Sequence, residues 1–89
     1  MGSNDLEWLV YLLQCADGTL YCGCTNNLSK RLTKHNYGKG AKYTASRRPL
    51  RLVWHSHRMS KSSAFKEEYR IKRLPRSEKM KLAGLASDK

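Results

Sequence analysis

Two strand-like runs joined by the dipeptide Asp17-Gly18 constrain the fold of this chain more than any other feature. The first run covers residues 7–15 and the second covers residues 19–25, and both are rich in residues that favour β-strands. Because Asp-Gly is a preferred turn sequence, the two runs predict an antiparallel β-hairpin. The register of that hairpin decides which side chains share a face of the sheet.

Two turns are compatible with this sequence, and they place Tyr11 and Tyr21 differently. A two-residue turn at Asp17-Gly18 sends the two tyrosines to opposite faces of the sheet. A three-residue loop that also includes Ala16 pairs Tyr11 with Gly23, and both tyrosines then lie on one face. We predict the three-residue loop, with its glycine in the left-handed conformation.

The residues after the hairpin predict a helix that buries one narrow stripe. An asparagine at position 26 or 27 can cap its start, and the break at residues 38–40 ends it. The predicted buried stripe comprises Leu28, Leu32 and His35. At about 100° per residue, Arg31 borders this stripe, whereas Lys30 and Lys34 point well away from it.

The second half of the chain predicts one further strand and two further helices. A short helical turn is expected at residues 41–44, a strand at 50–57, and a long helix from the serines at 60–63 to Leu74. Pro75 stops that helix or starts a short final one. The predicted inward face of the long helix comprises Ala64, Phe65 and Ile71.

Two adjacent glutamates on the long helix have different predicted positions. Glu68 and Lys72 fall within the apolar face, whereas Glu67 falls well outside it. A carboxylate among apolar side chains is costly unless a cation meets it. Lys72, one turn further on, can supply an ion pair, and a divalent metal ion is the alternative cation.

These segments predict an α/β chain of the α+β type. A small three-stranded, mainly antiparallel sheet is flanked by helices, with the hairpin first, then a helix, the third strand and the C-terminal helices. We expect a single domain over residues 1–89, with a core at about residues 8–82 and flexible segments at 1–6 and 84–89.

Positive charge is concentrated in the middle of the chain. The sequence holds 18 Lys and Arg against 7 Asp and Glu, a formal net charge of +11. No acidic residue occurs between Gly18 and Lys66, and the charges of the two ends cancel. Such a field attracts a polyanion, and its binding weakens steeply with salt. The sequence therefore predicts nucleic acid as the partner.

The cysteines and the apolar runs indicate the compartment. No apolar run approaches the ~20 residues that span a bilayer, and the N-terminus lacks the features of a signal peptide. Cys15, Cys22 and Cys24 are an odd set that suits reduced thiols, and their spacing is a weak zinc signature. We expect a cytoplasmic protein with no membrane contact.

The order of these segments resembles the GIY-YIG nuclease superfamily and, within it, the small stand-alone bacterial members. Leu9-Val10-Tyr11 stands where that family has Gly-Ile-Tyr, and Tyr21-Cys22-Gly23 stands where it has Tyr-Ile-Gly. Residues 31–36 are similar to the family's arginine-containing helix, and residues 64–68 to its Ala-x-x-x-Glu helix. The asparagine that some members carry after the glutamate is missing.

The resemblance implies the GIY-YIG fold and a metal-dependent endonuclease that hydrolyses phosphodiester bonds in DNA. It assigns Glu68 as the ligand of one Mg²⁺ or Mn²⁺ ion and Arg31 as the contact to the scissile phosphate. Tyr11 or Tyr21 would orient or deprotonate the water, and His35 could share that work. A phenol with a usual pKa of about 10 is a poor base at neutral pH, so a nearby cation must lower it.

Basic side chains are predicted to contact phosphates rather than base edges. The predicted contacts are Lys39, Lys42, Arg47, Arg48 and Lys72. Single-stranded, branched or damaged DNA is the expected substrate, because so small a domain has little surface for long sequence readout. A non-catalytic DNA- or RNA-binding module on the same fold is the alternative. A protein partner could supply specificity, and a monomer or weak dimer is expected.

Overall fold

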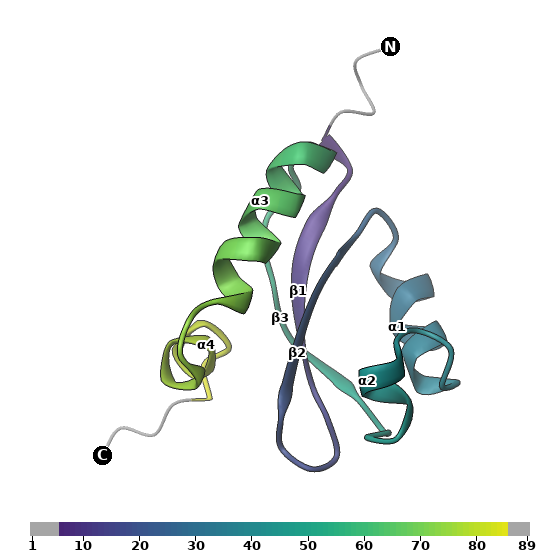
Figure 1. Cartoon of the computed structure of the whole chain (residues 1–89). Helices are drawn as coiled ribbons and strands as arrows, with labels where there is room; N and C mark the ends of the chain where they lie inside the picture. Colours follow the sequence, from purple (N-terminus) through teal and green to yellow (C-terminus); the bar gives the residue numbers. More distant parts are fainter. Residues whose placement is uncertain (1–5, 86–89) are drawn as a thin grey trace.

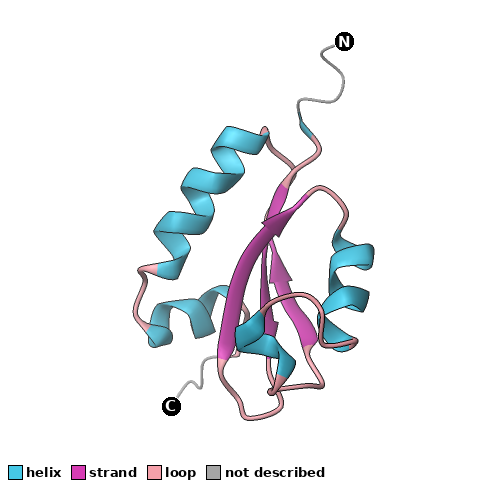
Figure 2. Cartoon of the chain, turned by 45° about the vertical axis from the view of Figure 1, so that its right-hand side comes forward, coloured by secondary structure: helices cyan, strands magenta, loops and turns pink. Residues whose placement is uncertain are grey.

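The computed structural model describes residues 6–85 and arranges them in three layers, with a sheet between two pairs of helices (Figure 1). The elements in chain order are β1 (Leu9–Gln14), β2 (Leu20–Thr25), α1 (Leu28–Asn36), α2 (Lys42–Ala45), β3 (Arg51–His55), α3 (Lys61–Lys72) and α4 (Arg76–Leu82). All strand pairs are antiparallel in the order β2-β1-β3, so β1 is central and β2 lies at an edge. Helices α1 and α2 cover one face, and α3 and α4 cover the other (Figure 2). The predicted α+β fold is confirmed.

Two further predictions concern flexible segments at the ends of the chain and the absence of membrane contact. Of the segments predicted to be flexible, residues 1–5 and 86–89 lie outside the described residues. Within residues 6–85, no helix has the length and apolar character needed to cross a membrane.

The hairpin has the register predicted for the three-residue loop. Tyr11 lies opposite Gly23, and Tyr21, two residues before that glycine, points to the same face as Tyr11. Gly18 has a φ of +87°, in the left-handed region that glycine adopts without strain. The two tyrosines therefore share one face of the sheet.

The face that carries both tyrosines packs under α1. Its buried core comprises Leu9, Tyr11, Leu13, Cys15 and Leu50, and Leu28 and Leu32 of α1 pack against it. Asn27 caps α1, because its Oδ1 accepts a hydrogen bond from the Lys30 backbone N–H at 3.2 Å. His35 is fully buried near the other end of the helix. The predicted stripe of α1 is confirmed.

The opposite face packs under α3 and α4. Its buried core comprises Val10, Leu12, Cys22, Ala64 and Ile71. Ser60 caps α3 by accepting a hydrogen bond from the Ser63 backbone N–H at 3.2 Å. Pro75 precedes α4, as predicted, since proline cannot continue α3 but fits the start of a helix.

Two side chains of α3 lie elsewhere than the sequence predicts. Phe65 is predicted on the inward face but is 48% exposed. The buried residues of α3 are Ala64 and Ile71, and Phe65 lies about 100° around the helix from Ala64, off the narrow stripe that a three-stranded sheet covers. Glu67 is predicted well outside the apolar face, but its side chain is only 31% exposed and borders a hollow beside β3.

The different burial of Ile71 and Phe65 predicts different costs of truncation. We expect Ile71→Ala to lower the free energy of unfolding by about 2–5 kcal/mol, because it leaves a cavity in the core. Phe65→Ala should cost less than about 1.5 kcal/mol, since half of this side chain is already exposed. Urea denaturation followed by circular dichroism measures both. An equal or larger loss in Phe65→Ala would contradict the packing described for α3.

Candidate functional site

A chain of three buried side chains links the sheet to α1 and α2. The Tyr11 hydroxyl lies 3.1 Å from His35 Nε2, and His35 Nδ1 lies 2.9 Å from Thr44 Oγ1. Thr44 in turn donates its hydroxyl proton to the Ala41 carbonyl at 3.0 Å. The three side chains are each at most 2% exposed.

The Thr44 hydroxyl determines which nitrogen of His35 carries the proton. Because its single proton goes to the Ala41 carbonyl, the Thr44 oxygen can only accept from His35. This geometry favours the tautomer with the proton on Nδ1, in which Nε2 accepts a hydrogen bond from the Tyr11 hydroxyl. Burial, and then the charge of Arg31, hold the pKa of His35 below its usual range, so the ring is neutral at neutral pH.

Two glycines leave room for this chain. A Cβ at position 23 would lie 2.5 Å from the Tyr11 hydroxyl, and a Cβ at Gly40 would overlap the imidazole of His35. Gly23 is the cross-strand partner of Tyr11, so the aromatic ring lies over a position that has no side chain. The glycine of the second sequence motif thus makes space for the tyrosine of the first.

Tyr21 lies beside the same histidine. Its ring meets His35 edge-on at a centroid distance of 5.2 Å and stacks on Tyr43 at 5.9 Å. Tyr21 is partly exposed, whereas Tyr11 is buried. Of the two phenols, Tyr21 is therefore the more accessible to a ligand.

Glu68 reaches β2 from the opposite helix layer. Its Oε2 lies 3.0 Å from the Lys72 ammonium, and its Oε1 accepts a hydrogen bond from the Cys24 thiol at 3.3 Å. Burial, and then this hydrogen bond, raise the pKa of Cys24 to about 12, so the thiol keeps its proton. Of the two cations that the sequence allows for Glu68, Lys72 is the one that pairs with it in this structure.

Charged groups from both helix layers act on the two phenols. Burial raises the pKa of Tyr21, while the cations of Lys72 and Arg31 lower it and the Glu68 carboxylate raises it. Burial also raises the pKa of Tyr11, and Arg31 only partly opposes that shift. The pKa of both phenols is thus raised, and the expectation that a nearby cation lowers it is wrong. Arg31 belongs to α1 and Glu68 to α3, so each of the two helix layers contributes a charge that acts on the phenols.

The residues around Glu68 fit a metal ion that is shared with a substrate. Within residues 6–85, no group of three or more His, Cys, Asp or Glu side chains could hold a metal by itself. One carboxylate is nevertheless the usual protein ligand where Mg²⁺ keeps several waters and binds phosphate oxygens. Glu68 is a carboxylate of this kind, with 20% of its side chain exposed and the Lys72 ammonium 3.0 Å away.

Of the five predicted phosphate contacts, Lys72 pairs with Glu68 and the other four fall into two groups. Lys39 and Lys42 are exposed on the loop before α2 and at its start. Arg47 pairs with Asp17 at 3.1 Å and lies over the Tyr43 ring, and Arg48 donates to the Ala45 carbonyl at 2.7 Å. The two arginines thus hold the loop together, whereas the lysines are available to a ligand.

A small polar hollow of about 190 Å³ lies at the start of α1. Lys30, Arg31 and Lys34 line it together with Asn26, Asn27 and Thr25. Among residues 6–85, the ion pairs are formed by Arg47, Arg70, Lys72 and Lys81, and none of them involves Arg31. Three cations and no carboxylate make this hollow suitable for a phosphate group. Lys30 and Lys34 are predicted from the sequence to point away from the core, without a predicted function.

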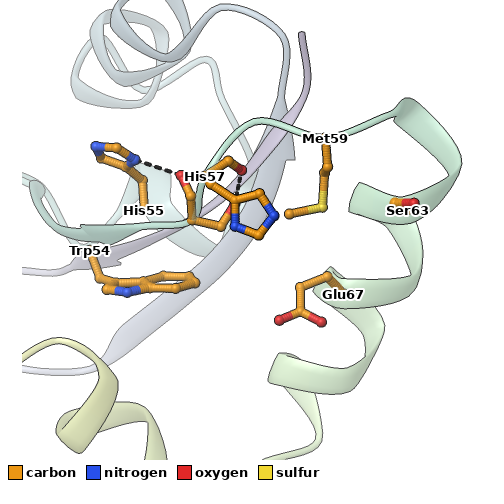
Figure 3. Close-up of a pocket in the computed structure, with 7 residues that line it drawn as sticks. Trp54, His55, His57, Met59, Ser63 and Glu67 are labelled. Carbon is orange, nitrogen blue, oxygen red and sulfur yellow. Dashed lines mark hydrogen bonds between the residues drawn. The ribbon is translucent and has the colours of Figure 1, made fainter. Parts of the chain in front are cut away.

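A second hollow, of about 490 Å³, lies between β3 and α3. Trp54 and Glu67 face it from the two elements, and His57 lies between them (Figure 3). Glu67 is held by Arg70, whose Nη2 lies 2.6 Å from Oε2. None of the predicted catalytic residues lines this hollow, so it is separate from the site at β2.

Sequence reasoning missed three residues that support the site. Thr44 orients His35, Tyr43 stacks on Tyr21, and Cys24 binds Glu68. Thr44 and Tyr43 lie on the short α2, whose position relative to α1 does not follow from periodicity. Cys24 carried a usable signal, because its side chain points away from the tyrosine face and therefore toward α3.

Comparisons with known proteins agree with this arrangement. The GIY-YIG catalytic domain family matches residues 7–82. A UPF0213 protein of Nitratidesulfovibrio vulgaris is 51% identical over 79 residues, covering 89% of this chain and 72% of that protein. UPF0213 protein OB0043 of Oceanobacillus iheyensis is 53% identical over 78 residues, covering 88% of this chain and 91% of that protein.

A solved structure shows the same likeness. The solution NMR structure of the UPF0213 protein BH0048 from Bacillus halodurans aligns with a TM-score of 0.55 and 45% identity, over 88% of this chain and 83% of that one. GIY-YIG domains are nuclease domains that bind nucleic acid and typically use a divalent metal ion. With the paired motifs on its hairpin and a family match over nearly its whole described length, this chain belongs to the GIY-YIG family.

Proposed function

We propose that this protein is a metal-dependent endonuclease that hydrolyses phosphodiester bonds in DNA. The observation that carries the proposal is the hydrogen-bonded chain of Tyr11, His35 and Thr44, in which the charges of Arg31 and Glu68 both act on Tyr11. In this chain a neutral imidazole lies within hydrogen-bond distance of a phenol and can accept a proton that is relayed through it. Family membership supports nuclease chemistry for such an arrangement.

The residues divide the work that hydrolysis requires. Arg31 neutralises the scissile phosphate with its forked donors, and Lys30 and Lys34 bind phosphate in the adjoining hollow. Tyr21 orients the attacking water, because it is the more accessible phenol. The Tyr11 hydroxyl takes up the proton that the water loses as it gives its own proton to Nε2 of His35, so the phenol stays neutral and the imidazole holds the proton.

Glu68 is the proposed ligand for one Mg²⁺ or Mn²⁺ ion. The ion, when bound, supplies positive charge beside the phosphate and lowers the pKa of bound water. In the free protein Lys72 holds the carboxylate in place at 3.0 Å. On substrate binding Lys72 turns to a phosphate instead, which keeps the local charge balanced. The thiol of Cys24 continues to orient the carboxylate.

Lys39 and Lys42 extend the phosphate path from the site along the basic loop. Sequence-independent contacts of this kind favour a substrate defined by its structure, namely single-stranded, branched or damaged DNA. A protein partner can add specificity to a domain that acts as a monomer or weak dimer. Free thiols at all three cysteines suit a reducing compartment such as the cytoplasm.

Neighbouring glutamates on α3 provide a matched test of catalysis. We expect Glu68→Gln to reduce Mg²⁺- or Mn²⁺-dependent cleavage by at least about 100-fold, because the metal ligand is lost. Glu67→Gln should stay within about threefold of the wild type, since Glu67 pairs with Arg70 on the other side of the helix. Cleavage of supercoiled plasmid and of a fluorescent single-stranded oligonucleotide measures both.

Two outcomes of this assay would count against the proposal. Equal residual cutting by wild type, Glu68→Gln and Arg31→Ala indicates a contaminating nuclease. Salt-sensitive DNA binding without any cleavage indicates a binding module, in which the Lys72–Glu68 ion pair persists in place of a metal. In either case catalysis by this chain is rejected.

The protonation of His35 predicts a pH dependence. His35 accepts the Tyr11 proton only while neutral, and burial lowers its pKa below the usual value of 6.5. Cleavage should therefore fall as pH decreases through a midpoint below 6.5 and level off above it. The folded state also loses stability over this range, because unfolded histidine takes up a proton more readily.

A pair of histidine variants identifies the group responsible. His35→Gln should abolish most cleavage and remove the acid-side fall from what remains, whereas His55→Gln, at an exposed position on β3, should keep the wild-type profile. Rate measurements from pH 5 to pH 8, at about one-unit intervals around the usual histidine pKa, give the comparison. An unchanged profile in His35→Gln would rule out this histidine as the proton acceptor.

A further inference from the structure

Two aromatic side chains on α3 are exposed where a core helix usually carries polar residues. Phe65 is 48% exposed and Tyr69 is 64% exposed. They lie four residues apart, which places their rings on one side of the helix, about 6 Å apart along its axis. Trp8 extends this row, because its ring meets Phe65 edge-on at a centroid distance of 5.7 Å. We call Trp8, Phe65 and Tyr69 the aromatic row.

Cations alternate with these rings. The Lys61 ammonium lies 5.4 Å from the centroid of Trp8 and 5.7 Å from that of Phe65. The Arg73 guanidinium lies 5.2 Å from the Tyr69 centroid and donates to its hydroxyl at 3.3 Å. Both cations sit at cation–π distance and stay exposed to solvent. The row therefore offers aromatic faces beside positive charges.

Little negative charge opposes a polyanion on this helix. Glu67 and Glu68 are the acidic residues of α3, and each is paired with a cation of the same helix. Lys66 adds a further exposed positive charge. The charge of the helix surface is thus complementary to a phosphate backbone.

The aromatic row lies on the side of α3 that carries Glu68. Counted at about 100° per residue from Glu68, Phe65 lies at about 60° and Tyr69 at about 100°, whereas Glu67 lies at about 100° in the opposite direction. Glu67 faces the hollow beside β3 (Figure 3). Phe65 and Tyr69 are thus on the same side of α3 as Glu68, within reach of a strand bound there, and away from the hollow beside β3.

We propose that the aromatic row is a stacking platform for the unpaired bases of a single-stranded nucleic acid. The proposal rests on the function proposed above, and it adds the surface that selects unpaired strands. Unpaired bases expose their faces to aromatic rings, and such stacking tolerates any sequence. The bases of a duplex are already stacked on each other, so a duplex can use only the cations of this surface.

Binding measurements in EDTA test the platform without interference from cleavage. The probes are a short fluorescent single-stranded oligonucleotide, an abasic strand of the same length, and the matched duplex, each followed by fluorescence anisotropy. The variant is Phe65→Leu with Tyr69→Leu, which keeps apolar contacts and helix propensity but removes the rings. The matched control is Tyr37→Leu, because Tyr37 is 72% exposed and carries no cation over its ring within residues 6–85.

We expect the double variant to bind the intact strand at least about tenfold more weakly, since each stacked base contributes substantially to affinity. Its affinity for the abasic strand and the duplex should change by less than about twofold, and Tyr37→Leu should match the wild type on all probes. Unchanged binding of the intact strand overturns the platform, and so does an equal loss on all three probes. If the double variant does not fold, Tyr69→Leu alone gives the same test at a more exposed position.

Wild-type cleavage with Mg²⁺ or Mn²⁺, measured in parallel, keeps the two proposals separate. If the wild type cleaves and the double variant binds the single strand as well as the wild type does, the stacking platform is rejected and the endonuclease proposal stands. If the double variant selectively loses single-strand binding but the wild type does not cleave, the endonuclease proposal is rejected and the stacking platform stands.

Discussion

The pairing of Tyr11 with Gly23 across the hairpin is the contact on which the rest of the site depends. It places the phenol over a residue without a side chain, where the hydroxyl can reach His35. A shift of one residue in the register would put Tyr11 and Tyr21 on opposite faces and separate the first from its histidine. Gly18 stabilises the register by closing the three-residue loop in a left-handed conformation. The spacing of the two tripeptide motifs thus has a steric reason.

The position of β2 at the edge of the sheet brings the two helix layers to one place. Arg31 comes from α1 and Glu68 from α3, yet both charges act on the same phenols. A central strand would have kept these layers apart. The carboxylates near the site are neutralised within the protein, by Lys72 for Glu68 and by Arg70 for Glu67. An approaching polyanion therefore meets the positive field of the acid-free stretch with little opposing charge.

Local sequence signals predicted most of the fold, and long-range packing explains what they missed. The residues of the turn predicted the hairpin register, and capping preference predicted that Asn26 or Asn27 starts α1. The apolar stripe of α1 predicted that His35 is buried. Helical periodicity placed Phe65 inward, but the width of the sheet decides how much of α3 is covered. The contact of Thr44 with His35 could not be predicted, because the docking of α2 on α1 depends on tertiary contacts rather than on a repeating pattern.

The tautomer of His35 tests the central claim most directly, because the Tyr11–His35–Thr44 chain works as a proton acceptor only in one form. Nitrogen NMR of the labelled imidazole distinguishes the protonated ring nitrogen from the unprotonated one. The account predicts a neutral ring at neutral pH with the proton on Nδ1 and a free electron pair on Nε2 toward Tyr11. A ring protonated on Nε2, or a charged imidazolium at neutral pH, would contradict it.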